Sequence, residues 1–312
     1  MTVWGVSSCR GNDPAVGCPR LPGRAARSRP RARRQQVGPA DGRGVVRQRS
    51  SILLGCIAVF VTLLVVLGVL SGSYLGVVAD RLPREERTST GRSHCDACGA
   101  ALRWFELIPI LSWLVQRGRC RRCGASITWA PLLMEILTGT LFGAMGARFG
   151  FHLETAAFVV LVGVLMPLGL IDLRTKRLPR QLIYVAGALG APLLVVAALI
   201  ADEPQRIWWA AVGGGGALAF FLALYLGWSG GMGDGDVRLA GLLGMYLGWI
   251  GLSHVPIGLF LGFLLGAVVG VALIARNGGD RKTAIPFGPF MAMGAVVTVL
   301  WGRNIVHLWL GH

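Results

Sequence analysis

The chain has 312 residues, of which 54% are hydrophobic and 15% are charged, and its mean hydropathy is +0.60. These values exclude an ordinary soluble domain and are typical of a protein that crosses a membrane several times. The formal net charge is +16, and residues 1–50 supply +9 of it because they hold 11 arginines against two aspartates. We therefore expect a lipid bilayer as a partner and no nucleic acid.

Residues 1–50 are rich in Arg, Pro and Gly and poor in large apolar side chains, which predicts a disordered tail. Two interpretations are open. The segment is either a solvated basic tail or a stretch that precedes the true translation start. A shorter protein would need a start codon other than Met, because no Met separates Met1 from Met134.

Eight apolar stretches follow, and a helix needs about 20 such residues to cross a bilayer. In chain order they are residues 52–79, 131–149, 155–173, 181–200, 207–228, 239–252, 255–275 and 286–302. The predicted fold class is an all-α polytopic membrane protein with about eight transmembrane helices. After the tail, we expect a first helix at 51–79, a small module at 80–130, a membrane core at 131–303 and a C-terminal tail at 304–312.

Four cysteines lie between the first two stretches, in two Cys-x2-Cys pairs separated by 21 residues: Cys95, Cys98, Cys120 and Cys123. Two such pairs present four thiolates to one tetrahedral zinc ion, and Gly99 and Gly124 ease the turn after each pair. Four thiolates leave no open position, so the spacing predicts structural rather than catalytic zinc. The alternatives are redox-active or unliganded thiols.

An apolar segment runs between the two cysteine pairs, and its side chains are too clustered for a solvated loop. They are Trp104, Phe105, Leu107, Ile108, Ile110, Leu111, Trp113 and Leu114. They either form the core of the small module or dock it on the membrane surface, where Trp is favoured. A core is the simpler expectation.

Basic residues gather in alternate loops. The loops after the third, fifth and seventh stretches hold eight Lys or Arg residues, whereas the other loops and the C-terminal end hold three. Short loops rich in Lys and Arg stay in the cytoplasm. By this rule the ends that carry Asp172 and Asp236 face the cytoplasm, and so does the 80–130 module. That reducing compartment disfavours disulfides among the four cysteines.

Asp172, in LIDLRTKRLP, and Asp236, in GGMGDGDVRLAG, stand at the ends of two apolar stretches. An ionisable residue in such a place indicates function by default. Two carboxyl groups that share one water supply an acid and a base near neutral pH, which suits hydrolysis of a peptide bond. The simpler interpretations are a boundary charge beside Arg174 and Lys176 for Asp172, and a helix cap for Asp236.

These motifs resemble the bacterial type IV prepilin peptidases, whose catalytic loop has the GxGD form shared with presenilin-type proteases. The form fits twice, ending at Asp234 and at Asp236, but only Asp236 is followed by the apolar, basic and Leu residues of the family pattern. The other family aspartate precedes Leu-Pro, as Asp172 precedes Leu178-Pro179. The blocks at 71–83, 92–139 and 284–295 are also similar to the family.

The resemblance implies an aspartic endopeptidase of the bacterial inner membrane. It would cleave the leader of type IV prepilins or pseudopilins at the cytoplasmic face. Asp172 and Asp236 would be catalytic, and Gly233, Gly235 and Arg238 would support the catalytic loop. The resemblance further implies N-methylation of the new N-terminus with S-adenosylmethionine, for which the pattern assigns no residues. It does not indicate an oligomeric state or which pilin is cleaved.

Two features of the chain depart from the family pattern, and two rival functions remain. Glu106 and Gly76 stand where asparagines are usual. A rhomboid-like serine protease would use Ser229 in GWSG with His254, but a helix over 239–252 would hold these residues about 20 Å apart. A zinc-stabilised transporter or assembly scaffold without catalysis would carry its carboxyl groups near the middle of the membrane.

Overall fold

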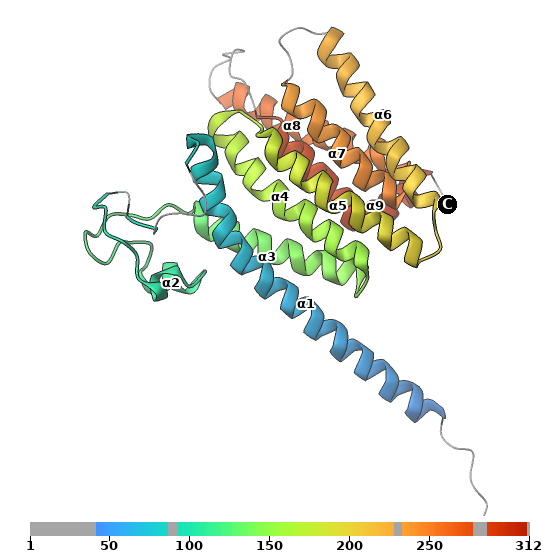
Figure 1. The fold of residues 1–312 in the computed structure, drawn as a ribbon, viewed down its shortest axis with the longest axis horizontal. Coiled ribbons are helices and arrows are strands. Elements are labelled where there is room, and N and C mark those ends of the chain that lie inside the picture. The colour runs from blue at the N-terminus through green and yellow to red at the C-terminus, as the bar shows by residue number, and fades with distance from the viewer. Residues whose placement is uncertain (1–41, 87–92, 96, 228–232, 277–285, 311–312) are drawn as a thin grey trace, which may run out of the picture. The chain divides into compact units, whose positions relative to one another are not determined.

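The computed structural model describes residues 42–86, 93–95, 97–227, 233–276 and 286–310. Within these ranges the fold is helical, without strands, and two isolated β-bridges lie in the cysteine module. The described part of the chain holds nine α-helices (Figure 1): α1 Gly42–Arg81, α2 Leu111–Val115, α3 Ala130–Phe149, α4 Leu153–Thr175, α5 Arg180–Ile200, α6 Gln205–Gly227, α7 Asp234–Ile250, α8 His254–Arg276 and α9 Gly288–Leu310.

The eight long helices coincide in order with the eight predicted stretches, and the predicted fold class is confirmed. Six of them are long and apolar enough to cross a membrane: α1 from Leu54 onward, α3, α4, α5, α6 and α8. The remaining two are α7, which has 17 residues, and α9, whose apolar part is Gly288–Gly302. The protein is therefore an all-α, multi-pass membrane protein.

Three helix ends differ from the predicted stretches. Helix α1 begins at Gly42 rather than at 52, and α9 continues to Leu310 rather than ending at 302. A helix does not stop where the bilayer does, since Arg and Gln are good helix formers. Helix α7 begins at Asp234 rather than at 239, because acidic residues in the first turn stabilise a helix start. The predicted disordered tail covered residues 1–50. Its last part, residues 42–50, instead belongs to α1, and residues 1–41 lie outside the described residues.

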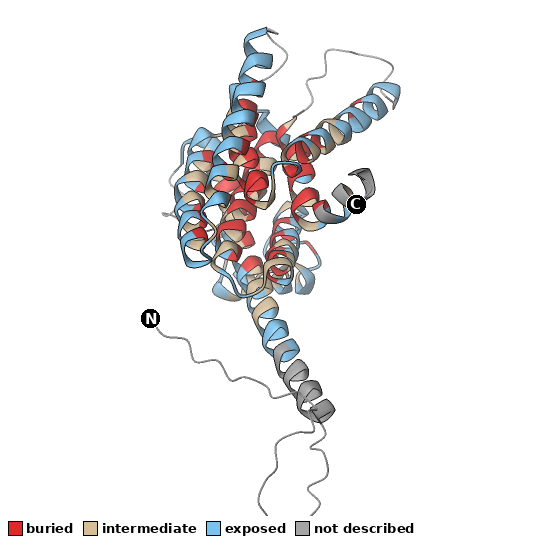
Figure 2. Cartoon of the chain, turned by 90° about the vertical axis from the view of Figure 1, so that its right-hand side faces the viewer, coloured by how far each residue is buried: buried red, intermediate tan, exposed pale blue. Residues whose placement is uncertain are grey.

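Close packing in the bundle depends on small residues where two backbones approach each other. A Cβ on Gly213 of α6 would lie 2.5 Å from the carbonyl oxygen of Gly244 of α7. A Cβ on Gly72 of α1 would likewise lie 2.7 Å from the carbonyl oxygen of Met134 of α3. Helices in membranes commonly pack through such residues. Figure 2 shows buried residues gathered between the helices and exposed ones on the outer faces.

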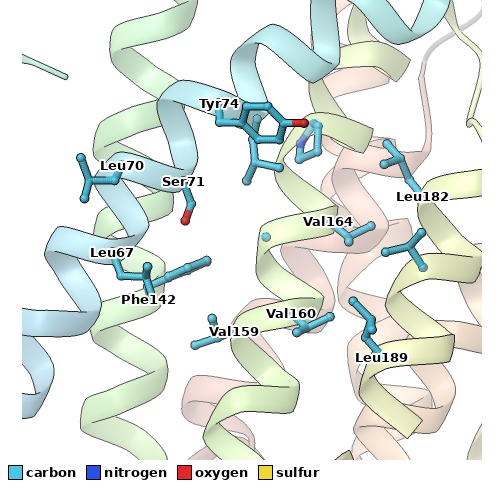
Figure 3. Close-up of a pocket in the computed structure, with 14 residues that line it drawn as sticks. Leu67, Leu70, Ser71, Tyr74, Phe142, Val159, Val160, Val164, Leu182 and Leu189 are labelled. Carbon is cyan, nitrogen blue, oxygen red and sulfur yellow. The ribbon is translucent and has the colours of Figure 1, made fainter. Parts of the chain in front are cut away.

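An apolar groove of about 580 Å³ opens between α1, α4 and α5 (Figure 3), and Phe142 of α3 also lines it. Its walls include Leu67, Val164 and Leu182, and its polar side chains are those of Ser71 and Tyr74. Among the described residues that line it, none is an acid, a histidine or a cysteine.

Candidate active site and metal centre

Asp172 lies three residues before the end of α4 and is 4% exposed. The backbone N–H of Gly288, the first residue of α9, donates a hydrogen bond of 3.0 Å to its Oδ2. Unpaired amides at a helix start favour a nearby carboxylate. The simpler interpretation of Asp172 as a boundary charge is wrong, because the side chain is buried. Its basic neighbour Arg174 forms an ion pair with Asp80 of α1 instead.

Asp236 is the third residue of α7 and is 8% exposed. The backbone N–H of Gly233, which occupies the cap position, donates a hydrogen bond of 3.2 Å to Oδ2 of Asp236. The carboxylate thus satisfies one unpaired donor at the helix start, as the acidic partner in a capping box does. The helix-capping interpretation is therefore correct in part. It does not account for the second buried carboxyl group nearby.

Leu178, in the connection between α4 and α5, brings the two aspartates into one site. A Cβ on Gly235 would lie 2.5 Å from the Cβ of Leu178. A Cβ on Gly288 would lie 3.0 Å from the Cδ2 of Leu178 and 2.8 Å from the Oδ2 of Asp172. Leu178 therefore lies beside both Gly235, which precedes Asp236, and Gly288, which bonds to Asp172. The end of α4 and the starts of α7 and α9 therefore meet around this pair.

The neighbouring acid, Asp234, has a different environment. Its side chain is 58% exposed and forms an ion pair with Arg238, one turn further along α7. Arg238 therefore contacts the exposed acid rather than the buried pair. Of the two overlapping GxGD patterns, the one that ends at Asp236 places its acid beside Asp172. Gly231 and Met232, which belong to the other pattern, lie outside the described residues.

The serine-protease alternative receives no support from the position of His254. This residue begins α8, at the opposite end of α7 from Asp236. Helix α7 has 17 residues, so it separates the two ends by about 25 Å at 1.5 Å per residue. Ser229 lies outside the described residues.

The four cysteines of the module converge on one point. Their sulfur atoms all lie within 4.8 Å of one another, and the Sγ atoms of Cys95 and Cys123 are 3.8 Å apart. Four sulfurs placed tetrahedrally at about 2.3 Å from a zinc ion would be about 3.8 Å apart. The arrangement therefore fits a four-coordinate metal ion that has no open position.

The two cysteine pairs adopt equivalent turns. The N–H of Gly99 donates to the carbonyl of Cys95 at 2.8 Å, and that of Gly124 donates to the carbonyl of Cys120 at 2.9 Å. Both glycines have φ near +70° (68° and 71°), which L residues rarely adopt. Backbone N–H groups of Cys123 and Arg122 donate to Cys120 and lower the pKa of its thiol to about 6. This favours the thiolate of Cys120, which is the metal-binding form. At Cys123 the backbone of Ala125 lowers the pKa, but burial and hydrogen bonds with the other cysteines outweigh it and raise the pKa to about 11.

The predicted core of the module is wrong. None of the eight apolar side chains between the cysteine pairs is buried, and Trp104 is 77% exposed. Trp113 instead packs against Trp129, which precedes α3, with ring centroids 4.6 Å apart. Phe105, Ile110 and Trp113 are half-buried and the other five are exposed, because a segment this short cannot enclose its own side chains.

Sequence patterns did not single out Gly288, which bonds to Asp172, or Glu135, which connects the module to α3. Glu135, on α3, is 7% exposed, and the backbone N–H of Ile110 donates to its Oε2 at 2.6 Å. Ile110 has φ of 61°, which is rare for a β-branched residue. An acid inside a predicted membrane stretch was a signal that could have identified Glu135. For Gly288, the available signal was its position at the start of the last apolar stretch.

Together, the helices and these two sites define a multi-pass membrane protein with a buried pair of carboxyl groups and a four-cysteine module. Residues 66–149 match the Bacterial Peptidase A24 N-terminal domain, and residues 159–271 match the Type IV leader peptidase family. The chain belongs to the type IV leader peptidase family and is an aspartic endopeptidase.

Three relatives illustrate this membership, and each is named a prepilin leader peptidase/N-methyltransferase. The Xanthomonas campestris protein is 33% identical, over 77% of this chain and 91% of its own length. The Bacillus subtilis protein is 31% identical, over 80% and 97%, and the Pseudomonas aeruginosa protein is 31% identical, over 80% and 93%. No solved structure shows a significant match to the chain.

Proposed function

We propose that this protein removes the leader from type IV prepilins or pseudopilins at the cytoplasmic face of the inner membrane, with Asp172 and Asp236 as its catalytic pair. The observation that carries the proposal is the burial of two carboxyl groups, 64 positions apart in the chain, beside the starts of two helices. The names of the relatives support a prepilin as the substrate.

The pair would work as one acid and one base. Two carboxyl groups this close do not both ionise readily, so one retains its proton near neutral pH. The ionised group takes a proton from a water molecule, whose oxygen attacks the carbonyl carbon of the scissile peptide bond. The protonated group donates a hydrogen bond to the carbonyl oxygen. As the C–N bond breaks, the proton taken from water passes to the leaving amine.

The cytoplasmic orientation rests on the distribution of basic residues. The connections at the aspartate end carry most of the Lys and Arg residues of the loops, including Arg174, Lys176 and Arg177. The transporter hypothesis has less support, because carboxyl groups that carry ions should lie near the middle of the membrane. Here Asp172 is near the end of α4 and Asp236 is at the start of α7.

A structural zinc ion and a second activity complete the proposal. Cys95, Cys98, Cys120 and Cys123 would hold Zn²⁺, which would fix the fold of the module and supply no reacting group. The names of the relatives also support N-methylation. In that reaction the new N-terminal amine would take the methyl group from the sulfur of S-adenosylmethionine and release a proton. No residues are assigned to this cofactor.

The test expresses the protein together with a prepilin and follows the loss of leader mass by mass spectrometry. Asp172→Asn and Asp236→Asn should each abolish cleavage. The matched control is Asp234→Asn, which changes an exposed acid two positions away and should leave cleavage in place. If Asp234→Asn stops cleavage while Asp236→Asn does not, the assignment of the pair is wrong. Detection of N-methylated mature pilin in the same samples would test the second activity.

A further inference from the structure

Large exposed apolar side chains are concentrated in the cysteine module and at the residue before α3, and we name this set the apolar face. It consists of Trp104, Leu107, Leu111, Leu114, Val115 and Trp129. Their exposed fractions run from 48% for Leu107 to 77% for Trp104. An exposed cluster of this kind in a soluble environment would promote aggregation, and it marks an interaction surface.

The apolar face continues into the lipid-facing side of α3. Leu133, Ile136 and Leu137 of that helix are 51%, 42% and 47% exposed, as expected for side chains that contact lipid. Trp129 immediately precedes α3, and its ring packs against Trp113 of α2. The contact between Trp129 and Trp113 therefore joins the start of α3 to α2.

The hydrogen bond between Ile110 and Glu135 ties the apolar face to α3. Glu135 lies five residues after the start of α3 at Ala130, in the second turn of that helix. The N–H of Ile110, immediately before α2, bonds to that side chain at 2.6 Å. Helix α2 is therefore held next to the first turns of a membrane helix.

The charge around the apolar face suits a membrane surface. The segment 103–122 holds five arginines and one glutamate, and all five arginines are exposed: Arg103, Arg117, Arg119, Arg121 and Arg122. Anionic headgroups attract basic residues beside a membrane helix. Tryptophan, which occurs at both ends of this surface, is favoured at the boundary between lipid and water.

We infer that the apolar face lies in the membrane interface and holds the cysteine module on an anionic lipid bilayer beside α3. The module is thus attached to the membrane at three places: α1 before it, α3 after it, and its own apolar face. This attachment is independent of the peptidase reaction, because it uses neither aspartate of the buried pair.

Depth measurements on the full-length protein would test this inference. A spin-labelled non-natural amino acid replaces Leu114 in one sample and Ser126 in another, so the native cysteines stay intact. Both positions are exposed on the module. The protein is placed in nanodiscs of phosphatidylcholine and phosphatidylglycerol. The label at 114 should collide several-fold more with oxygen than with a water-soluble nickel complex, and the label at 126 should show the reverse preference.

Two results would overturn the inference. One is a label at 114 that is as accessible to nickel as the label at 126. The other is protection of position 114 that appears only after a prepilin is added, because the surface would then bind substrate rather than lipid. Zinc content and leader cleavage in the labelled samples would show that the module and the peptidase core remain folded.

Discussion

The buried aspartate pair and the four-cysteine centre are assembled in different ways. The cysteines lie within 29 consecutive positions, and two equivalent tight turns aim their sulfurs at one point. The aspartates come from separate helices, and only the packing of α4, α7 and α9 around Leu178 brings them together. One site depends on local backbone geometry, whereas the other depends on contacts between distant helices. A substitution at either site should therefore disrupt that site and leave the other intact.

Loss of the metal should be the largest effect at the cysteine centre. We expect about one zinc ion per chain in the purified protein, and none in a Cys95→Ser/Cys120→Ser variant, because two ligands cannot hold the ion tightly. Elemental analysis of the two proteins would measure this. The change of Cys56, which is exposed and distant in sequence from the cluster, to Ser is the control and should retain zinc. A wild-type protein that folds fully without metal would contradict the assignment.

A single methyl group should break the aspartate site while leaving the zinc in place. Gly235→Ala would place a Cβ 2.5 Å from the Cβ of Leu178, and Gly288→Ala would place one 2.8 Å from the Oδ2 of Asp172. Displacement of a catalytic group by about 1 Å can lower a rate by about 100-fold, and we expect a loss of that size. Initial rates of leader cleavage would measure it.

The control for this experiment is Gly169→Ala, on the same helix as Asp172, where an added Cβ would meet nothing within 4 Å. It should cleave at the wild-type rate. Equal losses in all three variants would show that the packing around Leu178 has no special role.

Removal of the Glu135 acceptor should weaken the attachment of α2, in the cysteine module, to α3. Glu135→Leu leaves the N–H of Ile110 without its partner, and an unsatisfied buried donor costs about 1–3 kcal/mol. Hydrogen exchange at residues 108–112 should become faster by a corresponding factor. Glu135→Gln keeps an acceptor oxygen and should show a smaller change. Unchanged exchange in Glu135→Leu would mean that this bond does not hold α2 to α3.

The smallest effect should come from the ion pair between Asp80 of α1 and Arg174 of α4. Both side chains are more than 40% exposed, so Asp80→Asn should cost less than about 1 kcal/mol of stability. Thermal unfolding in detergent, compared with that of the wild type, would detect a larger change. A shift as large as that of Glu135→Leu would contradict this assessment.

Sequence patterns predicted most of the helices because each crosses an apolar medium and must be apolar along its length. The zinc spacing was equally visible, since its geometry is local. Contacts between distant segments were not visible: nothing near Gly288 in the sequence shows that its N–H faces Asp172. The choice of Asp236 over Asp234 came from a family pattern, and its physical basis, burial against exposure, required the fold.

The error over the apolar segment of the module has a general cause. A hydrophobic side chain avoids water, but it can do so either in the protein interior or in lipid. For Trp104 and Leu114 the sequence offered both environments, and the simpler expectation was the wrong one. The exposed fractions of these side chains exclude a packed interior.

The hydrogen bond from Gly288 to Asp172 also bears on how the enzyme is made. When the ribosome has synthesised Asp172 and Asp236, it has not yet synthesised α9, whose first residue, Gly288, donates its N–H to Asp172. Nascent chains that stop short of this helix would hold the two acids in an unfinished arrangement. Peptidase activity would then appear only after α9 has been synthesised, so incomplete chains would not cleave neighbouring proteins in the bilayer.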